Sequence, residues 1–247
     1  FENDDIVHVS GKVSPIDDIE IINTELILSD LSIVEKLYQK AQKNTKSGQK
    51  EGMPMKELVE KILTALKEGT SLRKLTFGKE ELVLLKNFQL LTLKPVLYVA
   101  NVNESGFENN PHMDLILEYA KEDHSKVVPI CAEIEAEICE LSNDEKKEFL
   151  LEMGQSESAL DRLIKAGYDL LGLHTYFTAG EKEVKAWTIT VGDSAPVAAG
   201  KIHTDFEKGF IRAETISFQD YITYKGEKGA KDAGKLRTEW KDYVVKD

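Results

Sequence analysis

The chain has 247 residues, of which 41% are hydrophobic and 31% charged, and its formal net charge is −12. This length allows one or two domains with a substantial core. The acidic balance argues against sequence-blind binding of nucleic acid by the whole surface, but it permits a local basic patch. No apolar run approaches the roughly 18 residues that span a bilayer, so we expect no membrane partner.

The start of the chain and its cysteines bear on location. The residues from Phe1 onward contain no basic segment followed by an apolar one, so nothing predicts secretion and we expect a cytoplasmic protein. Cys131 and Cys139 have no metal-type partner spacing around them. We therefore expect two buried free thiols.

Residues 1–28 predict a short strand followed by a helix. Ile6–Val9 is apolar apart from His8 and is closed by Ser10-Gly11. Pro15 and the acidic pair Asp17-Asp18 then favour a helix start, because acids in the first turn suit the helix dipole.

Residues 29–92 have a hydrophobic period near 3.6, which predicts two amphipathic helices. The polar, Gly- and Lys-rich turn 43–54 separates their apolar stripes. This pattern predicts an antiparallel helical hairpin, either a projecting arm or an ordinary helical subdomain. A third segment is expected to pack along its base. The stripe residues are Leu31, Val34, Leu37, Tyr38 and Ala41, then Leu58, Val59, Ile62, Leu63 and Leu66, then Leu82, Leu85 and Phe88 in the third segment.

Residues 93–140 alternate between strands and helices. Val96–Ala100 and Val127–Cys131 are apolar runs, with a helix predicted at Pro111–Lys121 between them. Continuous apolar strands separated by helices indicate a parallel sheet covered on both faces. Ligands of such sheets sit at the carboxyl ends of the strands, so residues 101–104 and 131–134 are expected to meet there.

From about residue 172 the pattern is rich in strands again. A strand, a Gly-Asp turn and a short helix beginning at Ala195-Pro196 are followed by predicted strands within 209–217 and 220–226. This order is typical of a small α+β module of the ubiquitin-like, β-grasp kind.

Asn101-Val102-Asn103-Glu104 resembles the Asn-Lys-x-Asp segment with which P-loop GTPases read guanine. In that segment the Asp accepts paired bonds from guanine N1–H and the N2 amino group. Glu104 is one methylene longer and would overrun the guanine edge, and Val102 removes the Lys that covers the base. We therefore expect weakened guanine selectivity and a preference for ATP. On four residues alone, an unselective loop remains the alternative.

A phosphate-binding loop is not found within the sequence. The one near match, Gly229–Leu236, ends in a residue without a hydroxyl for Mg²⁺, and no apolar strand precedes it. We interpret it as a coincidence.

Longer segments identify the chain as similar to the YchF (Obg-like ATPase) branch of the Obg-related P-loop NTPases, which are described as ribosome-binding ATPases. The resemblance runs over essentially all 247 residues. It is carried by residues 1–13, 22–31, 91–111, 166–189 and 198–216.

The resemblance implies an α/β fold: the parallel sheet of a partial P-loop NTPase (G domain), an inserted antiparallel helical coiled-coil arm, and a C-terminal α+β β-grasp (TGS) domain. The corresponding ranges are 1–28 and 93–171, 29–92, and 172–247. It also implies ATP hydrolysis in preference to GTP, with Mg²⁺, and association with the ribosome. The P-loop and the last TGS strand of the family have no counterpart in these residues, so the chain alone is expected to be inactive.

The resemblance also suggests roles for single residues. Asn101, Val102 and Glu104, with Cys131 and Ala132 on the neighbouring loop, would surround the purine. His8 matches a His proposed to orient the attacking water; a strand-end His bonded to backbone is the alternative. No metal ligand is expected among the residues present.

A basic cluster near the C-terminus is the candidate for RNA contact. It mixes cations with aromatic side chains, which suits phosphate contact and base stacking, and a solubilising surface is the alternative. Together with the helical arm it supports a second hypothesis, a non-catalytic ribosome-binding module. The cluster comprises Lys225, Lys228, Lys231, Lys235, Arg237 and Lys241, with Tyr221, Tyr224 and Trp240 nearby.

Overall fold

A computed structural model describes residues 11–46 and 53–246. They divide into two compact units, the first ending at Leu170 and the second beginning at Leu171. The predicted strand at residues 6–9, including His8, lies outside the described residues. None of the described helices combines the length and the hydrophobicity that crossing a bilayer requires.

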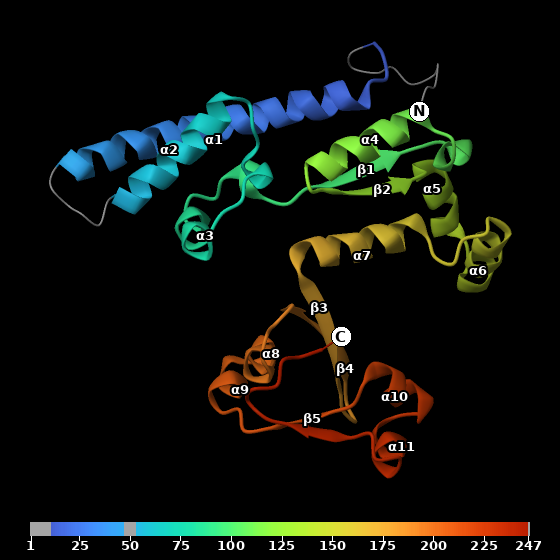
Figure 1. Ribbon diagram of the computed structural model, residues 1–247. Helices are drawn as coiled ribbons and strands as arrows, with labels where there is room; N and C mark the ends of the chain where they lie inside the picture. The colour runs from blue at the N-terminus through green and yellow to red at the C-terminus, as the bar shows by residue number, and fades with distance from the viewer. Residues whose placement is uncertain (1–10, 47–52, 247) are drawn as a thin grey trace. The chain divides into compact units, whose positions relative to one another are not determined.

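The N-terminal unit begins with an antiparallel helical hairpin, as predicted. Helix α1 (Pro15–Lys46) lies beside α2 (Met53–Lys67), and Figure 1 shows the two side by side. Helix α1 continues unbroken across residues 28 and 29, so no change of secondary structure marks the predicted start of the inserted segment. The short helices η2 (Leu72–Lys74), α3 (Lys79–Lys86) and η3 (Leu91–Leu93) follow.

The predicted stripes form the hairpin core. Val34 and Ile62 are fully buried, and Leu85 of α3 joins the same cluster. The prediction is wrong for Leu82, which is 45% exposed. Leu82 and Leu85 are three residues apart in a helix of eight residues, and only one of them is covered by the hairpin.

Asp30 holds together the two ends of the helical segment that contains this hairpin. Its carboxylate is fully buried and accepts hydrogen bonds from the main-chain N–H groups of Leu91 and Thr92 at 2.8 and 2.7 Å. The Thr92 hydroxyl donates a third, at 2.7 Å. Because Asp30 and Thr92 stand at opposite ends of residues 29–92, the two ends of the helical segment meet at this contact.

The α/β part of the unit holds two parallel strands, β1 (Leu97–Asn101) and β2 (Lys126–Ile130), with Asn101 opposite Ile130. Helix α4 (Pro111–Glu122) crosses between them, and Met113 and Ile116 pack on Ala100. The prediction of a sheet covered on both faces holds only in part for the described residues. Val99 and Val128 are paired and share the face away from α4. On that face Val128 is buried, but Val99 is 44% exposed. Helices α5 (Ala132–Glu140), α6 (Asn143–Glu152) and α7 (Ala159–Leu171) complete the segment.

The cysteines are only partly as predicted. Cys131 is buried, whereas Cys139 is exposed. Successive residues of a helix point about 100° apart. Ile138 turns toward the interior of the unit, so its neighbour Cys139 turns to solvent.

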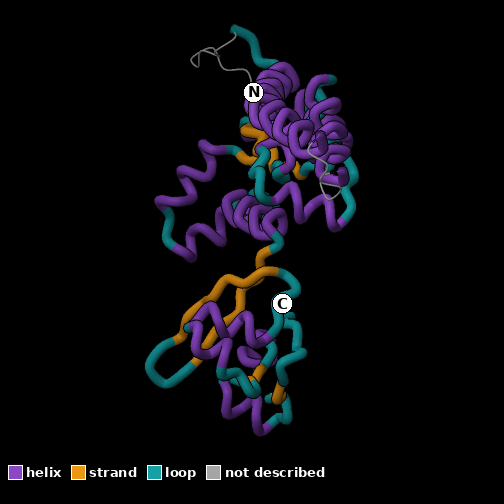
Figure 2. The backbone as a smooth tube through the Cα atoms, turned by 90° about the vertical axis from the view of Figure 1, so that its left-hand side faces the viewer, coloured by secondary structure: helices purple, strands orange, loops and turns teal. Residues whose placement is uncertain are grey.

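The C-terminal unit combines small antiparallel sheets with short helices (Figure 2). Strand β3 (Leu173–Ala179) pairs with β4 (Val184–Thr190), and β5 (Ala213–Thr215) pairs with β6 (Arg237–Glu239). Helix α8 (Ala195–Ile202) starts at the predicted Ala195-Pro196 and contacts β4. The remaining helices are α9 (Thr204–Lys208), α10 (Phe218–Thr223) and α11 (Glu227–Asp232).

The predicted strand at 220–226 is wrong, because most of that segment belongs to α10. The hydroxyl of Ser217 accepts a hydrogen bond from the Asp220 N–H at 3.1 Å and donates to its carboxylate at 2.8 Å. Ser-x-x-Asp is a helix-start signature, and it outweighs the β preference of Tyr221, Ile222 and Tyr224 as residue types.

Candidate nucleotide-binding site

The ends of β1 and β2 lie together, as the sequence predicts. The Val102 N–H donates to the Ile130 carbonyl at 2.8 Å and so extends the strand pairing by one residue. The side-chain oxygen of Asn101 accepts from the Ala132 N–H at 3.2 Å. Asn101 therefore joins the two loops that follow the strands.

The five predicted base-contacting residues differ in exposure. Asn101, Glu104 and Ala132 are exposed, whereas Val102 and Cys131 are only 5% and 3% exposed. Side chains with so little exposed surface offer a ligand only a small contact area. Val102 and Cys131 would therefore act through their backbone or by holding the loops in place.

Glu104 begins a short 3-10 helix, η4 (Glu104–Phe107), that closes on itself. The Gly106 N–H donates to the Asn103 carbonyl at 2.9 Å. Gly106 is buried, and its carbonyl accepts from the side chain of Asn110 at 3.0 Å. The loop that carries Glu104 is thus tied to the start of α4.

A cavity of about 220 Å³ adjoins this loop, between the start of α1, strand β1 and α4. Asn101 and Val102 line it, but Glu104, Cys131 and Ala132 do not. Asn110 and His112 also line it, and the sequence prediction missed both. The signal for Asn110 was present, because Asn followed by Pro at the first helical position is a strong helix start.

A buried polar cluster joins the helical segment to β1 and to the end of α4. The Asp123 carboxylate accepts from Arg73 Nε, the Tyr98 hydroxyl and the Ser125 hydroxyl, each at 2.9 Å. Arg73 also donates to the side chain of Asn23 in α1 at 2.5 Å. Burial and the bond to Asp123 raise the pKa of Tyr98 to about 12.

The described residues do not fit a catalytic Mg²⁺ site. Among them, no cluster of three His, Cys, Asp or Glu side chains is placed to hold a metal ion. His8, the predicted water-orienting residue, lies outside the described part of the chain.

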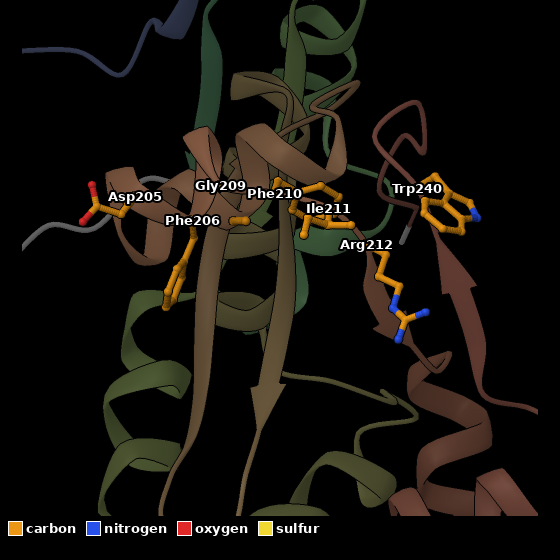
Figure 3. A pocket seen from close by; sticks show the side chains of 8 residues that line it. Asp205, Phe206, Gly209, Phe210, Ile211, Arg212 and Trp240 are labelled. Atoms are coloured by element: carbon orange, nitrogen blue, oxygen red, sulfur yellow. The ribbon is translucent and has the colours of Figure 1, made fainter.

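The C-terminal unit contains a larger hollow of about 720 Å³ (Figure 3). Phe206 and Trp240 stand at opposite sides of it, with Phe210, Ile211 and Arg212 between them. Trp240 is 58% exposed, and the cations of the predicted basic cluster are exposed too. Two of these cations are paired with acids: Lys235 with Asp220 at 3.7 Å and Arg237 with Glu239 at 3.3 Å.

The near match to a phosphate loop does not have the required structure. Gly229 lies inside α11 rather than in a loop after a strand. This placement agrees with its interpretation as a coincidence.

Comparison with known proteins gives one consistent result. A family model described as YchF-GTPase_C, a protein of unknown function (DUF933), matches residues 173–247. The ribosome-binding ATPase YchF of Escherichia coli O157:H7 is 58% identical over all 247 residues, which cover 68% of that protein. The protein of the same name from Bacillus subtilis is 50% identical over 250 aligned residues, again with 68% of its length covered.

A solved structure, that of the Schizosaccharomyces pombe YchF GTPase, matches 99% of this chain and 68% of its own chain. The TM-score is 0.86 and the sequence identity is 34%. The two bacterial proteins are named as ATPases and the Schizosaccharomyces pombe protein as a GTPase.

Proposed function

Because the chain belongs to the YchF family of ribosome-binding ATPases, we propose that it carries the purine-reading part of a nucleotide site that prefers ATP to GTP. In the whole protein, ATP would be hydrolysed with Mg²⁺ in association with the ribosome, which would put the protein in the cytoplasm. The observation that supports this most strongly is similarity over the entire chain rather than over one motif.

The same proposal assigns the parts of the chain. Residues 1–28 and 93–171 would belong to a G domain of the P-loop NTPase type, and 29–92 to an inserted helical coiled-coil arm. Residues 172–247 would form a TGS domain of the β-grasp kind. The hairpin of α1 and α2 and the parallel pair of β1 and β2 are compatible with that division.

Asn101 would contact the purine without choosing between bases. Its side-chain oxygen is occupied by the Ala132 N–H, which leaves the amide nitrogen as the end that can donate. Purine N7 is an acceptor in both adenine and guanine. This contact would orient the ring and contribute affinity for either nucleotide.

Glu104 would supply the selectivity, by failing to recognise guanine. A carboxylate one methylene longer than Asp overruns the N1–H and N2 donors of guanine. Adenine N1 is an acceptor and repels a carboxylate, so the N6 amino group would donate to a main-chain carbonyl of the two loops instead. ATP is then favoured because GTP loses its charge-assisted pair of bonds.

Substitution Glu104→Asp tests this account in a full-length protein that carries these residues. The shorter acid should restore the paired guanine bonds and raise GTP affinity relative to ATP by about tenfold. Equilibrium binding of fluorescent ATP and GTP analogues measures the ratio. A wild-type preference for GTP, or an unchanged ratio in the variant, would contradict the role given to Glu104.

Catalysis itself would need groups beyond those described. His8 is proposed to orient the attacking water, since imidazole can accept a proton near neutral pH. The 247-residue chain alone should show no ATP turnover, because phosphate and metal positioning supply most of phosphoryl-transfer catalysis. His8→Ala in the full-length protein should retain ATP affinity and lose turnover; unchanged turnover would remove His8 from the mechanism.

The exposed basic cluster favours a second candidate function, ribosome binding without turnover. Lys225, Lys228 and Lys231 are exposed in the C-terminal unit, and so are Tyr224 and Trp240. Exposed cations with exposed aromatic rings suit phosphate contacts and base stacking. ATP hydrolysis by the full-length protein, stimulated or not by ribosomes, would decide against this second candidate.

A further inference from the structure

The loop that carries Glu104 is closely packed around Gly106. A Cβ atom at Gly106 would lie 2.6 Å from the Asn103 side-chain oxygen and 3.0 Å from Val102 Cβ. Real Cβ atoms essentially never approach other atoms within 3.0 Å. The side chain of Asn103 is exposed and can turn aside, so the contacts that a side chain at position 106 would strain are those with Val102 Cβ and, at 3.3 Å, with Asn110 Nδ2.

Asn110 holds this loop from the side of α4. Its side-chain oxygen accepts from the N–H groups of His112 and Met113 at 3.1 and 3.3 Å, which caps the helix. Its side-chain nitrogen donates to the Gly106 carbonyl at 3.0 Å. One amide thus serves two structures, the start of a helix and the loop before it.

Helix α4 is a firm support for that connection. Met113 and Ile116 are buried against Ala100 of β1, the residue before Asn101. The Gly106 carbonyl is therefore held in place relative to β1, the strand that carries Asn101. Glu104 is exposed, lies two residues before Gly106, and takes its place from the backbone of the loop.

We propose that Asn110 is a positioning residue for base selectivity, which sets the place of the Glu104 carboxylate through the Gly106 carbonyl. This inference rests on the proposed role of residues 101–104 in reading the purine. Its physical basis is that a carboxylate can discriminate bases only if its distance from the ring is constant. A loop released from α4 would let Glu104 adapt to either base.

The two functions of Asn110 can be separated by substitution. Asn110→Asp keeps an oxygen that caps α4, where a negative charge is also favourable, but it loses the donor to Gly106. Asn110→Ala loses both the cap and the tether. Ser142→Ala is the matched control, because it removes the N-cap of α6. In the part of the chain that the structure describes, the hydrogen bonds of Ser142 go to Glu145 and not to this loop.

The experiment measures, in the full-length protein, ATP and GTP affinity together with the urea midpoint of unfolding. Asn110→Asp should lower the midpoint less than Asn110→Ala does, because it keeps the cap, while its ATP-to-GTP affinity ratio falls about fivefold, a change of the size of one ordinary hydrogen bond. Asn110→Ala should show the same ratio change and a lower midpoint. Ser142→Ala should lower the midpoint and leave the ratio unchanged.

The outcomes separate this inference from the function on which it rests. If Glu104→Asp shifts the ratio and Asn110→Asp does not, Asn110 only caps the helix and the inference is overturned. If neither Glu104→Asp nor Asn110→Asp shifts the ratio, the base-reading role of the loop fails as well. Because Asn110→Asp retains the cap, the test stands even if Asn110→Ala does not fold.

Discussion

At the scale of single residues, Asp123 shows how a buried charge is stabilised. Its side chain is fully buried and receives hydrogen bonds from Arg73, Tyr98 and Ser125. Removing one partner of a buried ion pair is costly, because an uncompensated charge remains in a medium of low polarity. This cluster joins Asn23 of α1 and Arg73 of η2 to β1, the strand that leads into the candidate site.

Tyr98 makes this cluster sensitive to alkaline pH. Burial, followed by the hydrogen bond to Asp123, raises its pKa from the ordinary 10.0 to about 12. Between these values the unfolded chain has lost the phenol proton and the folded chain retains it, so stability falls as the pH rises from 10 toward 12. Below pH 10 the contribution is fully present.

The substitution Tyr98→Phe should flatten this alkaline loss. Urea midpoints measured across the same pH range should fall less steeply in the variant than in the wild type. Tyr176 is also half-buried with a raised pKa, so the difference between the two proteins, rather than either curve, reports on Tyr98. Parallel curves would show that Tyr98 does not hold its proton more tightly in the folded state.

At the scale of elements, the hairpin core was predicted well because its signal is local. Residues spaced at 3.6 share a face whatever the rest of the chain does. The α2 stripe is buried as expected, and Leu31, Leu37 and Tyr38 of the α1 stripe are partly buried against it. The error concerns α3, where the same spacing places Leu82 and Leu85 near one face but the hairpin covers only Leu85.

Helix α3 therefore offers a matched pair of substitutions. Leu85→Ala should lower the free energy of unfolding by about 2–5 kcal/mol, because it leaves a cavity in a fully buried position. Leu82→Ala should change it by no more than about 0.5 kcal/mol, since 45% of that residue is already exposed. Chemical denaturation measures both, and equal effects would mean that Leu82 is covered in solution.

The short helix α10 illustrates the opposite difficulty. Its β-favouring residues gave a strand prediction, and a single cap at Ser217 decides for a helix instead. Elements of six residues hold too few repeats for periodicity to decide between strand and helix.

At the scale of the whole molecule, the net charge determines which part of the surface can bind a polyanion. A net charge of −12 disfavours binding by the surface at large, so RNA contact would depend on the basic cluster. Lys228 and Lys231 are the best candidates for substitution, because Lys235 and Arg237 are already paired with acids.

Replacing Lys228 and Lys231 together by Ala should weaken ribosome association and reduce its salt dependence. The slope of log affinity against log salt should fall by roughly one for each phosphate that the variant no longer neutralises. Co-sedimentation of the full-length protein with ribosomes at several salt concentrations measures this slope. The double variant Lys121→Ala/Lys147→Ala removes the same charge from exposed sites on α4 and α6 and should have no such effect.

The sequence by itself determined the hairpin, the two parallel strands with α4 between them, the meeting of their carboxyl ends and the family. Those features follow from patterns within a few residues or from extended similarity. Only the tertiary structure decided that Asp30 binds Thr92 and that Arg73 binds Asp123, across separations of 62 and 50 residues. Asn110 as a tether for the Glu104 loop was also visible only there. A polar side chain shows in the sequence what it can donate or accept, but packing alone selects the partner it meets.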